Sequence, residues 1–513
     1  MFKGYVISAA VGTTFVVLVL WLVCSSVAGM PSQYAQERKK MADKERSMRL
    51  GSQLTLNDRE EMVNCYLMSL KQFMIATSTA GKTLFPPSQH FFHTKADIDN
   101  STLFHIIQMM PKGGSLHLHE SCMTSLEWVI KNLTYMDNLY TRMEESGEVR
   151  ARLYLFSQAS PGTEWTLMSE LRAAQTDVDR FDQELLDTLA MWGTEPYASN
   201  HEAWNDFHAY FRGIDGFLTN MESRRLYDLH GIEEAYDDGL QYLEWRVSAN
   251  NTDMVEYIRM LQGIVKDFKA EHPDFLGVKV IFEGMRESTP ATVSDNVRKV
   301  ANAMKLFPDE VKGYDLTNEE DVVNRLEHFV DVLVDDEGTA LLPYFFHAGE
   351  TTWSGGADMN LLDAVLLNTT RIGHGFATVK HPEVLKAVME RPIPVEVNPV
   401  SNQVLALVRD LRDHPASSMI SYGAPVVISS DNPNVYFAKM QSHDSYAAFM
   451  GLASQQDDLR LLKQLAINSL KYSAMTETEK TDAFAAWQIR WDLFVEEVIA
   501  KYNLESYCQK PNL

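Results

Sequence analysis

Residues 110–120 read MPKGGSLHLHE and give the strongest local indication of how the chain folds. Its small and apolar residues are typical of a short buried strand, and this strand ends in two histidines, His117 and His119. Side chains two residues apart on a strand point to the same face, so both imidazoles can reach one metal ion. A lone His-x-His pair can also be two half-exposed histidines, and the rest of the sequence has to decide between these interpretations.

Short apolar runs alternate with helical stretches after residue 113, which is the pattern of parallel strands joined by helices. Eight runs are predicted to be strands: residues 114–119, 240–247, 277–286, 311–316, 342–347, 370–374, 393–398 and 424–430. Eight parallel strands close a TIM-like (β/α)8 barrel, so the predicted fold class is α/β. About 120 residues separate the first two strands, which predicts an insertion at about 124–200.

The chain of 513 residues has room for a barrel of roughly 250 residues and further regions. Residues 29–105 are predicted to form an N-terminal helical region with a Pro-Pro break at Pro86 and Pro87, and residues 106–513 the barrel domain. The net charge of −24, from 46 basic and 70 acidic residues, disfavours nucleic acid or anionic lipid as a partner. A neutral or cationic small molecule fits this charge better.

The first 28 residues have the form of a secretory signal peptide, with Lys3, an apolar core at 15–23 and small residues before a cleavage site. The alternative is an uncleaved membrane anchor, because the uncharged stretch 4–36 is long enough to span a bilayer. Sequons that agree with secretion and predict N-glycosylation lie at Asn100, Asn132, Asn250 and Asn368. The protein is therefore predicted to be secreted.

Three other predicted strands end in residues that can bind metal or carry protons. C-terminal strand ends form the rim where barrel enzymes hold their active sites. Three imidazoles and one carboxylate suit Zn²⁺ and leave a position open for water. One zinc ion per chain is predicted, with His117, His119, His347 and Asp431 as its ligands.

Two further rim residues are predicted to be catalytic. Glu350 lies three residues beyond His347 and is placed to carry a proton. His374 lies between two glycines and can orient water or stabilise developing charge. Singly, His347 could be a core histidine and Asp431 a helix N-cap, but their joint occurrence favours the metal site. The other histidines, among them His201, His208, His414 and His443, are predicted to be surface or packing residues.

These motifs together resemble the adenosine deaminase-related growth factors, the secreted branch of the adenosine deaminases. The resemblance covers most of the chain and rests on MPKGG before HLH, FHAGET (346–351), RIGHG (371–375), VEVNPVSN (395–402) and SSDNP (429–433). It implies deamination of adenosine to inosine, in which activated water adds to carbon 6, Glu350 protonates ring nitrogen 1 and His374 assists. It further implies a homodimer supported by the N-terminal helices, an insertion that binds a receptor or glycan, and growth-factor-like activity.

The resemblance also assigns substrate contacts. It places Trp204 and Phe207 in a substrate lid, for which the alternative is a core-facing helix stripe. Three positions depart from the family: Glu120 replaces an aspartate that binds ribose, Asn318 a glycine whose amide meets the purine, and Asn432 an aspartate that pairs with purine nitrogen 7. Two alternatives therefore stay open, namely a weakly active or inactive secreted signalling or nucleoside-binding protein, and a deaminase of another aminopurine.

Overall fold

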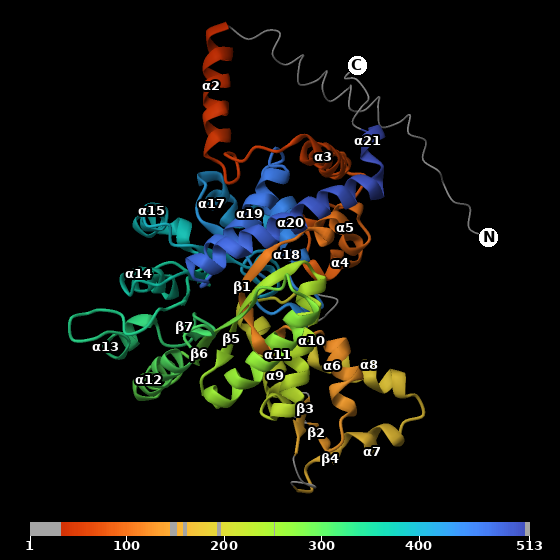
Figure 1. Ribbon diagram of the computed structural model, residues 1–513, viewed down its shortest axis with the longest axis vertical. Coiled ribbons are helices and arrows are strands. Elements are labelled where there is room, and N and C mark those ends of the chain that lie inside the picture. The colour runs from red at the N-terminus through yellow and green to blue at the C-terminus, as the bar shows by residue number, and fades with distance from the viewer. Residues whose placement is uncertain (1–31, 144–150, 157–161, 192–195, 251, 508–513) are drawn as a thin grey trace.

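The computed structural model describes residues 32–143, 151–156, 162–191, 196–250 and 252–507 (Figure 1). The predicted signal peptide, residues 1–28, lies outside this part of the chain. Within the described residues, each helix is too short or too polar to cross a lipid bilayer. The asparagines of the four sequons are exposed on the surface.

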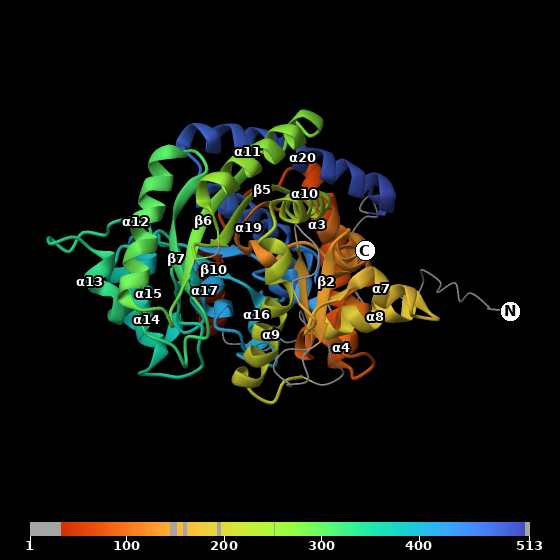
Figure 2. The same cartoon turned by 90° about the horizontal axis from the view of Figure 1, so that it is seen from below.

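Two four-stranded parallel sheets form the centre of the molecule, in the orders β1-β5-β6-β7 and β8-β9-β10-β11. The strands are β1 (Gly113–His119), β5 (Leu240–Ser248), β6 (Gly277–Met285), β7 (Val311–Thr317), β8 (His347–Ala348), β9 (Ile372–His374), β10 (Val395–Val397) and β11 (Val426–Ile428). Isolated parallel bridges, Leu118 with Asp431 and Tyr314 with Tyr344, join the sheets at both seams. The eight strands thus close into a barrel, seen from below in Figure 2, and the predicted fold is confirmed.

Every predicted barrel strand is present, but those of the second sheet are short. The run 342–347 is the clearest case, because only His347 and Ala348 form a regular strand there. Pro343 has no N–H to donate to a ladder, and its carbonyl accepts from Tyr314 instead. The segment therefore joins its neighbour by an isolated bridge and brings His347 to the rim at its end.

Helices cover the outside of the barrel and pack on it through faces on which apolar residues recur at helical spacing. Asp253 caps helix α11 by accepting from the N–H groups of Val255 and Glu256, and the helix buries a stripe that includes Tyr257 and Leu261. The α-helices from α10 to the end of the described chain are α10 (Met221–Asp237), α11 (Met254–Glu271), α12 (Pro290–Leu306), α13 (Val330–Leu333), α14 (Asn360–Leu366), α15 (Pro382–Glu390), α16 (Pro399–Val404), α17 (Ala416–Tyr422), α18 (Ser442–Ala447), α19 (Leu459–Lys471), α20 (Glu477–Tyr502) and α21 (Leu504–Tyr507).

Two regions are added to the barrel. The N-terminal one consists of α2 (Ser32–Met48), α3 (Asp58–Thr79), α4 (Phe91–Asp99) and α5 (Thr102–Met109), and α2, which buries no residue, projects from the molecule in Figure 1. Between β1 and β5 the chain forms α6 (Leu126–Lys131), β2 (Leu139–Met143), β3 (Ala151–Leu155), β4 (Thr166–Leu167), α7 (Met168–Ala173), α8 (Val178–Leu189) and α9 (Asn200–Leu218). Strands β2, β3 and β4 pair antiparallel, apart from the barrel sheets.

Candidate metal centre and active site

Strand β1 and the end of β11 build one half of the candidate metal centre. His119 donates its backbone N–H to the carbonyl of Asp431 at 3.1 Å, and Asp431 donates its own to the carbonyl of His117 at 3.0 Å. Asp431 has a φ of 61°, a left-handed conformation that aspartate tolerates better than most residues. The barrel seam itself therefore holds the carboxylate beside the two imidazoles.

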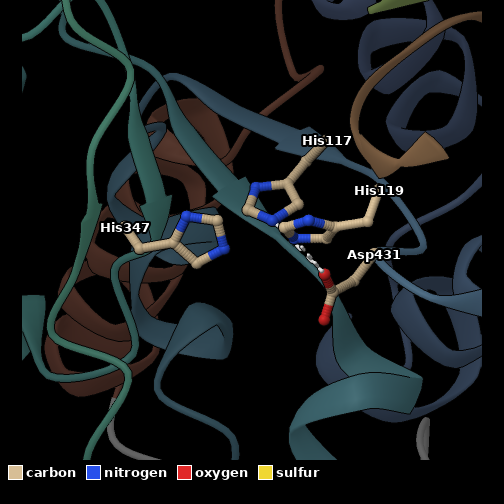
Figure 3. Close-up of side chains that lie close together, drawn as sticks. All are labelled: His117, His119, His347 and Asp431. Atoms are coloured by element: carbon tan, nitrogen blue, oxygen red, sulfur yellow. Dashed lines mark ion pairs between the residues drawn. The ribbon is translucent and has the colours of Figure 1, made fainter. Parts of the chain in front are cut away.

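His347, at the start of β8, completes the group from the other sheet. Each of the four side chains offers one ligand atom, and these atoms all lie within 4.8 Å of one another. All four residues are buried. Figure 3 shows the three imidazoles and the carboxylate of Asp431, all four of them predicted ligands, converging on a common centre.

Each imidazole of this cluster has an acidic partner on its far side. The Nδ1 atom of His117 lies 2.6 Å from Glu396 Oε2, and that of His347 lies 2.8 Å from Asp315 Oδ2. The Nδ1 atom of His119 lies 3.0 Å from Glu283 Oε2. A carboxylate at Nδ1 fixes the ring and raises the basicity of Nε2, which is the usual arrangement behind metal-binding histidines.

Two of the atoms that face the centre make no hydrogen bond to any residue that the structure describes, although they lie 3.4 Å from each other. His117 Nε2 and Asp431 Oδ1 are buried, and neither has a hydrogen-bond partner within the described part of the chain. A buried polar atom without a partner is costly, and a cation between the Nε2 atoms and the carboxylate would satisfy both. The donor set therefore fits a metal ion.

Beneath the cluster the barrel interior is ionic. Arg246 of β5 donates to Asp315 at 2.7 Å and to Glu396 at 2.8 Å, and Arg371 donates to Glu396 at 2.5 Å. Burial by itself would raise the pKa of Glu396, but the two guanidinium groups and His117 hold it well below its usual range. Glu396 therefore stays an anion that can orient His117.

Glu350 and His374 lie at the edge of the same cluster. Their nearest atoms, Glu350 Oε1 and His374 Nδ1, are 3.3 Å apart, and both residues group with Asp431. The carboxylate of Glu320 accepts the backbone N–H groups of Gly349 and Glu350 at 3.1 and 3.0 Å, which fixes the loop. Burial, together with the negative charges of Asp431 and Glu320, raises the pKa of Glu350 well above its usual value. A protonated acid is what a proton donor requires.

Two of the predicted substrate contacts are bound to other protein groups. Both carboxylate oxygens of Glu120 accept from Arg224, at 2.8 and 2.9 Å. Asn318, with a φ of 104°, accepts from His208 at 2.8 Å and donates to Glu287 at 2.8 Å. These side chains join the rim to α10 and α9 respectively.

The other predicted contacts are buried. Asn432 follows Asp431, and its Oδ1 has no hydrogen-bond partner among the described residues. Trp204 and Phe207 lie on α9 with their ring centroids 5.2 Å apart, within the apolar core. The structure thus places these two rings on a helix that is tied to the rim through His208 and Asn318.

Sequence reasoning missed the acidic partners of the three histidines. Glu283, Asp315 and Glu396 lie within the apolar runs FEGM, GYDL and VEVN near the ends of β6, β7 and β10. Burying a carboxylate within an apolar strand costs free energy unless the carboxylate is paired. A glutamate or aspartate inside an apolar run is therefore a sequence signal for a buried acid with a functional partner.

A (β/α)8 barrel with imidazoles and a carboxylate gathered at its strand ends defines the class of protein, a metal-dependent hydrolase with the amidohydrolase fold. Solved structures agree on the fold. An amidohydrolase from Burkholderia ambifaria with bound zinc superimposes with a TM-score of 0.56 at 19% identity, covering 78% of this chain and 96% of that one. The N6-methyl-AMP deaminase of Arabidopsis thaliana superimposes with a TM-score of 0.52 at 15% identity, covering 75% and 98%.

Sequence comparisons identify the family. Residues 166–485 match the adenosine deaminase family, and residues 15–107 match its adenosine/AMP deaminase N-terminal region. Adenosine deaminase 2 of Homo sapiens is 37% identical over 501 residues, covering 94% of this chain and 97% of that protein. An adenosine deaminase of Lutzomyia longipalpis is 38% identical over 506 residues, covering 93% and 98%. The chain belongs to the adenosine deaminase family, in its adenosine deaminase 2 branch, and is a hydrolytic deaminase.

Proposed function

We propose that this protein is an extracellular, zinc-dependent adenosine deaminase that converts adenosine and water into inosine and ammonia. The observation that carries the proposal is the cluster of His117, His119, His347 and Asp431 with the buried acid Glu350 beside it. Three imidazole nitrogens and one carboxylate oxygen are donors that suit Zn²⁺, which can expand to five ligands and so take a water as well. A zinc ion held by these four residues would supply Lewis acidity, which makes water a competent nucleophile at neutral pH.

The residues around the cluster then move and direct protons. Glu350, kept protonated by burial, gives its proton to ring nitrogen 1 of the purine as the oxygen of the attacking water adds to carbon 6. One proton of that water restores Glu350, and the other leaves with the amino group as ammonia. Burial lowers the pKa of His374 well below its usual value, so its ring is neutral. Its Nε2 lies 3.9 Å from Asp431 Oδ2, where it can orient the attacking water.

The test uses the purified chain reconstituted with zinc and mixed with adenosine, while the ultraviolet change to inosine is followed. Glu350→Ala is the control, and metal content is measured for both proteins. We expect turnover by the unaltered chain and a rate about 10³-fold lower in the variant. An unaltered chain that carries a full complement of zinc but works no faster than the variant would contradict the proposal.

A second candidate function is deamination of another aminopurine, and two residues at the rim of the site, Glu120 and Asn432, are the reason to test it. Glu120 is occupied by Arg224, and Asn432 places an amide where the family resemblance implies a carboxylate. The same assay with a panel of 6-aminopurines, with and without a ribose, separates the two. Turnover of one of these compounds without turnover of adenosine would replace the first function by the second, and binding without turnover would indicate a nucleoside-binding protein.

The extracellular location is supported by the sequence of residues 1–28 and by the exposure of the four sequon asparagines. Expression of the full chain in eukaryotic cells should release a protein that begins at Gly29 and loses mass on treatment with a peptide N-glycosidase. Retention in the membrane fraction with the first 28 residues attached would support the signal-anchor alternative instead.

The same proposal includes a homodimer and a receptor or glycan partner for the insertion at 124–200. The dimer is supported by α2, which buries none of its residues within the chain and exposes Tyr34 and Met41. Light scattering of the chain with and without residues 32–48 tests it, and a monomer in both cases would contradict it. Growth-factor-like activity would follow from deamination on this proposal, so the Glu350→Ala protein should lack it.

A further inference from the structure

A chain of hydrogen bonds leads from His374 away from the cluster to a second buried histidine. Asn402, on α16, lies between the two rings. Its Nδ2 is 3.0 Å from His374 Nδ1, and its Oδ1 is 3.0 Å from His414 Nε2. At the far end, the backbone N–H of Ala416 donates to His414 Nδ1 at 3.0 Å. All three side chains are buried, so water does not compete for these bonds.

The backbone N–H at the far end fixes the direction of every bond in this chain. An amide N–H can only donate, so His414 Nδ1 accepts and carries no proton. Burial lowers the pKa of His414 to about 3, and the neutral ring therefore has its proton on Nε2. That N–H donates to Asn402 Oδ1, and the amide of Asn402 must then turn its Nδ2 donor towards His374.

His374 receives this donor at Nδ1. A neutral imidazole that accepts at Nδ1 carries its proton on Nε2, and Nε2 is the atom that faces Asp431 at 3.9 Å. Asn398 brings a second amide donor to within 3.5 Å of the same Nδ1. Glu350 Oε1 also lies 3.3 Å from this atom, but it makes no hydrogen bond to any of the described residues. A proton on Nδ1 would face the two amide donors, so the other tautomer is disfavoured.

We propose that His414 and Asn402 are positioning residues, which hold His374 in the tautomer whose Nε2–H points into the site. This inference rests on the role proposed for His374 in the deaminase reaction. The N–H would donate to the oxygen of the attacking water and could not remove a proton from it. Where a histidine tautomer is wrong in a hydrolase, the loss in kcat can reach about 10⁴-fold.

Three variants separate this role from simple packing. Asn402→Asp is nearly isosteric but replaces the donor by an acceptor, which draws the proton of His374 onto Nδ1. We expect kcat to fall about 100-fold, with KM changed by no more than about twofold and zinc content unchanged. His414→Phe should lower kcat about 10-fold, and His414→Gln, which keeps a donor near the Nε2 position, should restore most of it.

His443 is the matched control, because it repeats the pattern of His414 without leading to the site. Its Nδ1 accepts the backbone N–H of Lys439 at 2.8 Å, and its Nε2 lies 2.8 Å from Asp99 Oδ1. It is also buried, between Phe91 and Phe104. His443→Phe and His443→Gln should leave kcat unchanged. An equal loss of kcat in the His443 and His414 variants would overturn the inference, because packing alone would then explain both.

A second readout does not need turnover. Histidine labelled with ¹⁵N at Nδ1 alone reports the tautomer by solid-state NMR, and the His374 signal is the one lost in His374→Gln. We expect a bare, pyridine-type nitrogen in the zinc-loaded protein and a protonated, pyrrole-type nitrogen in Asn402→Asp. A pyrrole-type signal in the unaltered protein would overturn the inference. Lack of turnover with the expected tautomer would instead contradict the proposed function alone.

Discussion

The metal cluster and the rim around it use their polar atoms in opposite ways. At the cluster, His117 and His347 give Nδ1 to buried carboxylates and turn the other nitrogen towards the centre. At the rim, Glu120 gives both oxygens to Arg224, and Asn318 is bound on both sides of its amide. An atom already paired within the protein is a poor substrate contact, because a new bond costs the old one. The cluster thus has polar atoms that are available to bind a metal ion. Glu120 and Asn318 at the rim instead use their polar atoms to stabilise the protein around the site.

The largest effect is expected at the cluster. Asp431→Asn keeps the shape of the side chain but removes the charge that balances a cation, so zinc content should fall and turnover should drop by roughly 10⁴-fold or more. Metal analysis and the adenosine assay measure both, and removal of zinc by a chelator should reproduce the loss reversibly. Full zinc content with normal turnover in the variant would show that the cluster does not need the charge of Asp431 to bind metal.

The next effect is a loss of stability at the rim. Arg224→Met leaves the buried carboxylate of Glu120 without its partner and also removes the cation that lies 4.1 Å from the Tyr257 ring. An unpaired buried charge costs about 3 kcal/mol or more, so the free energy of unfolding should fall by that amount.

Chemical denaturation of the Arg224→Met protein measures the change, and its zinc content should stay unchanged. An unchanged free energy of unfolding together with a raised KM would show that Glu120 and Arg224 bind the substrate and do not stabilise the fold.

A smaller effect is expected behind the metal. Glu283→Gln replaces the carboxylate that lies 3.0 Å from His119 Nδ1 by a neutral amide of the same shape. Loss of such an outer partner typically weakens metal affinity by about 10- to 100-fold. Competition with a zinc chelator measures the dissociation constant. Glu287→Gln is the matched control, because Glu287 is an exposed glutamate four positions further along the chain that accepts from Asn318. An equal change in both variants would contradict the role given to Glu283.

The parts of the site that could be predicted from sequence are those with a local signal. His117 and His119 are two residues apart on one strand, and Asp431 follows an apolar run that reads as a strand end. The barrel could be predicted for the same reason, since each strand is a short apolar run between turns.

The partners of these residues could not be predicted, because they lie far away in the chain. Glu396 is 279 positions from His117, and only the closed barrel brings them together. His208 and His414 were predicted to be surface or packing histidines. Their bonds to Asn318 and Asn402 depend on where α9 and the segment before α17 lie in the folded chain. Hydrogen-bond direction is likewise a property of the folded chain, since it follows from which backbone N–H meets which ring.

The smallest effect is expected from Asn318→Gly, and it decides what this part of the rim does. A φ of 104° strains an asparagine by about 1 kcal/mol, and glycine relieves that strain but loses the bonds to His208 and Glu287. The two contributions oppose each other, so the free energy of unfolding should change by less than about 1 kcal/mol. Asn318 positions α9 through its hydrogen bond to His208 if this bond is structural. His208→Phe removes the same bond, so it should then change KM for adenosine by the same factor as Asn318→Gly. A raised KM in Asn318→Gly alone would mean that the side-chain amide of Asn318 contacts the purine. Asn318 would then be a substrate contact and not a structural residue of the rim.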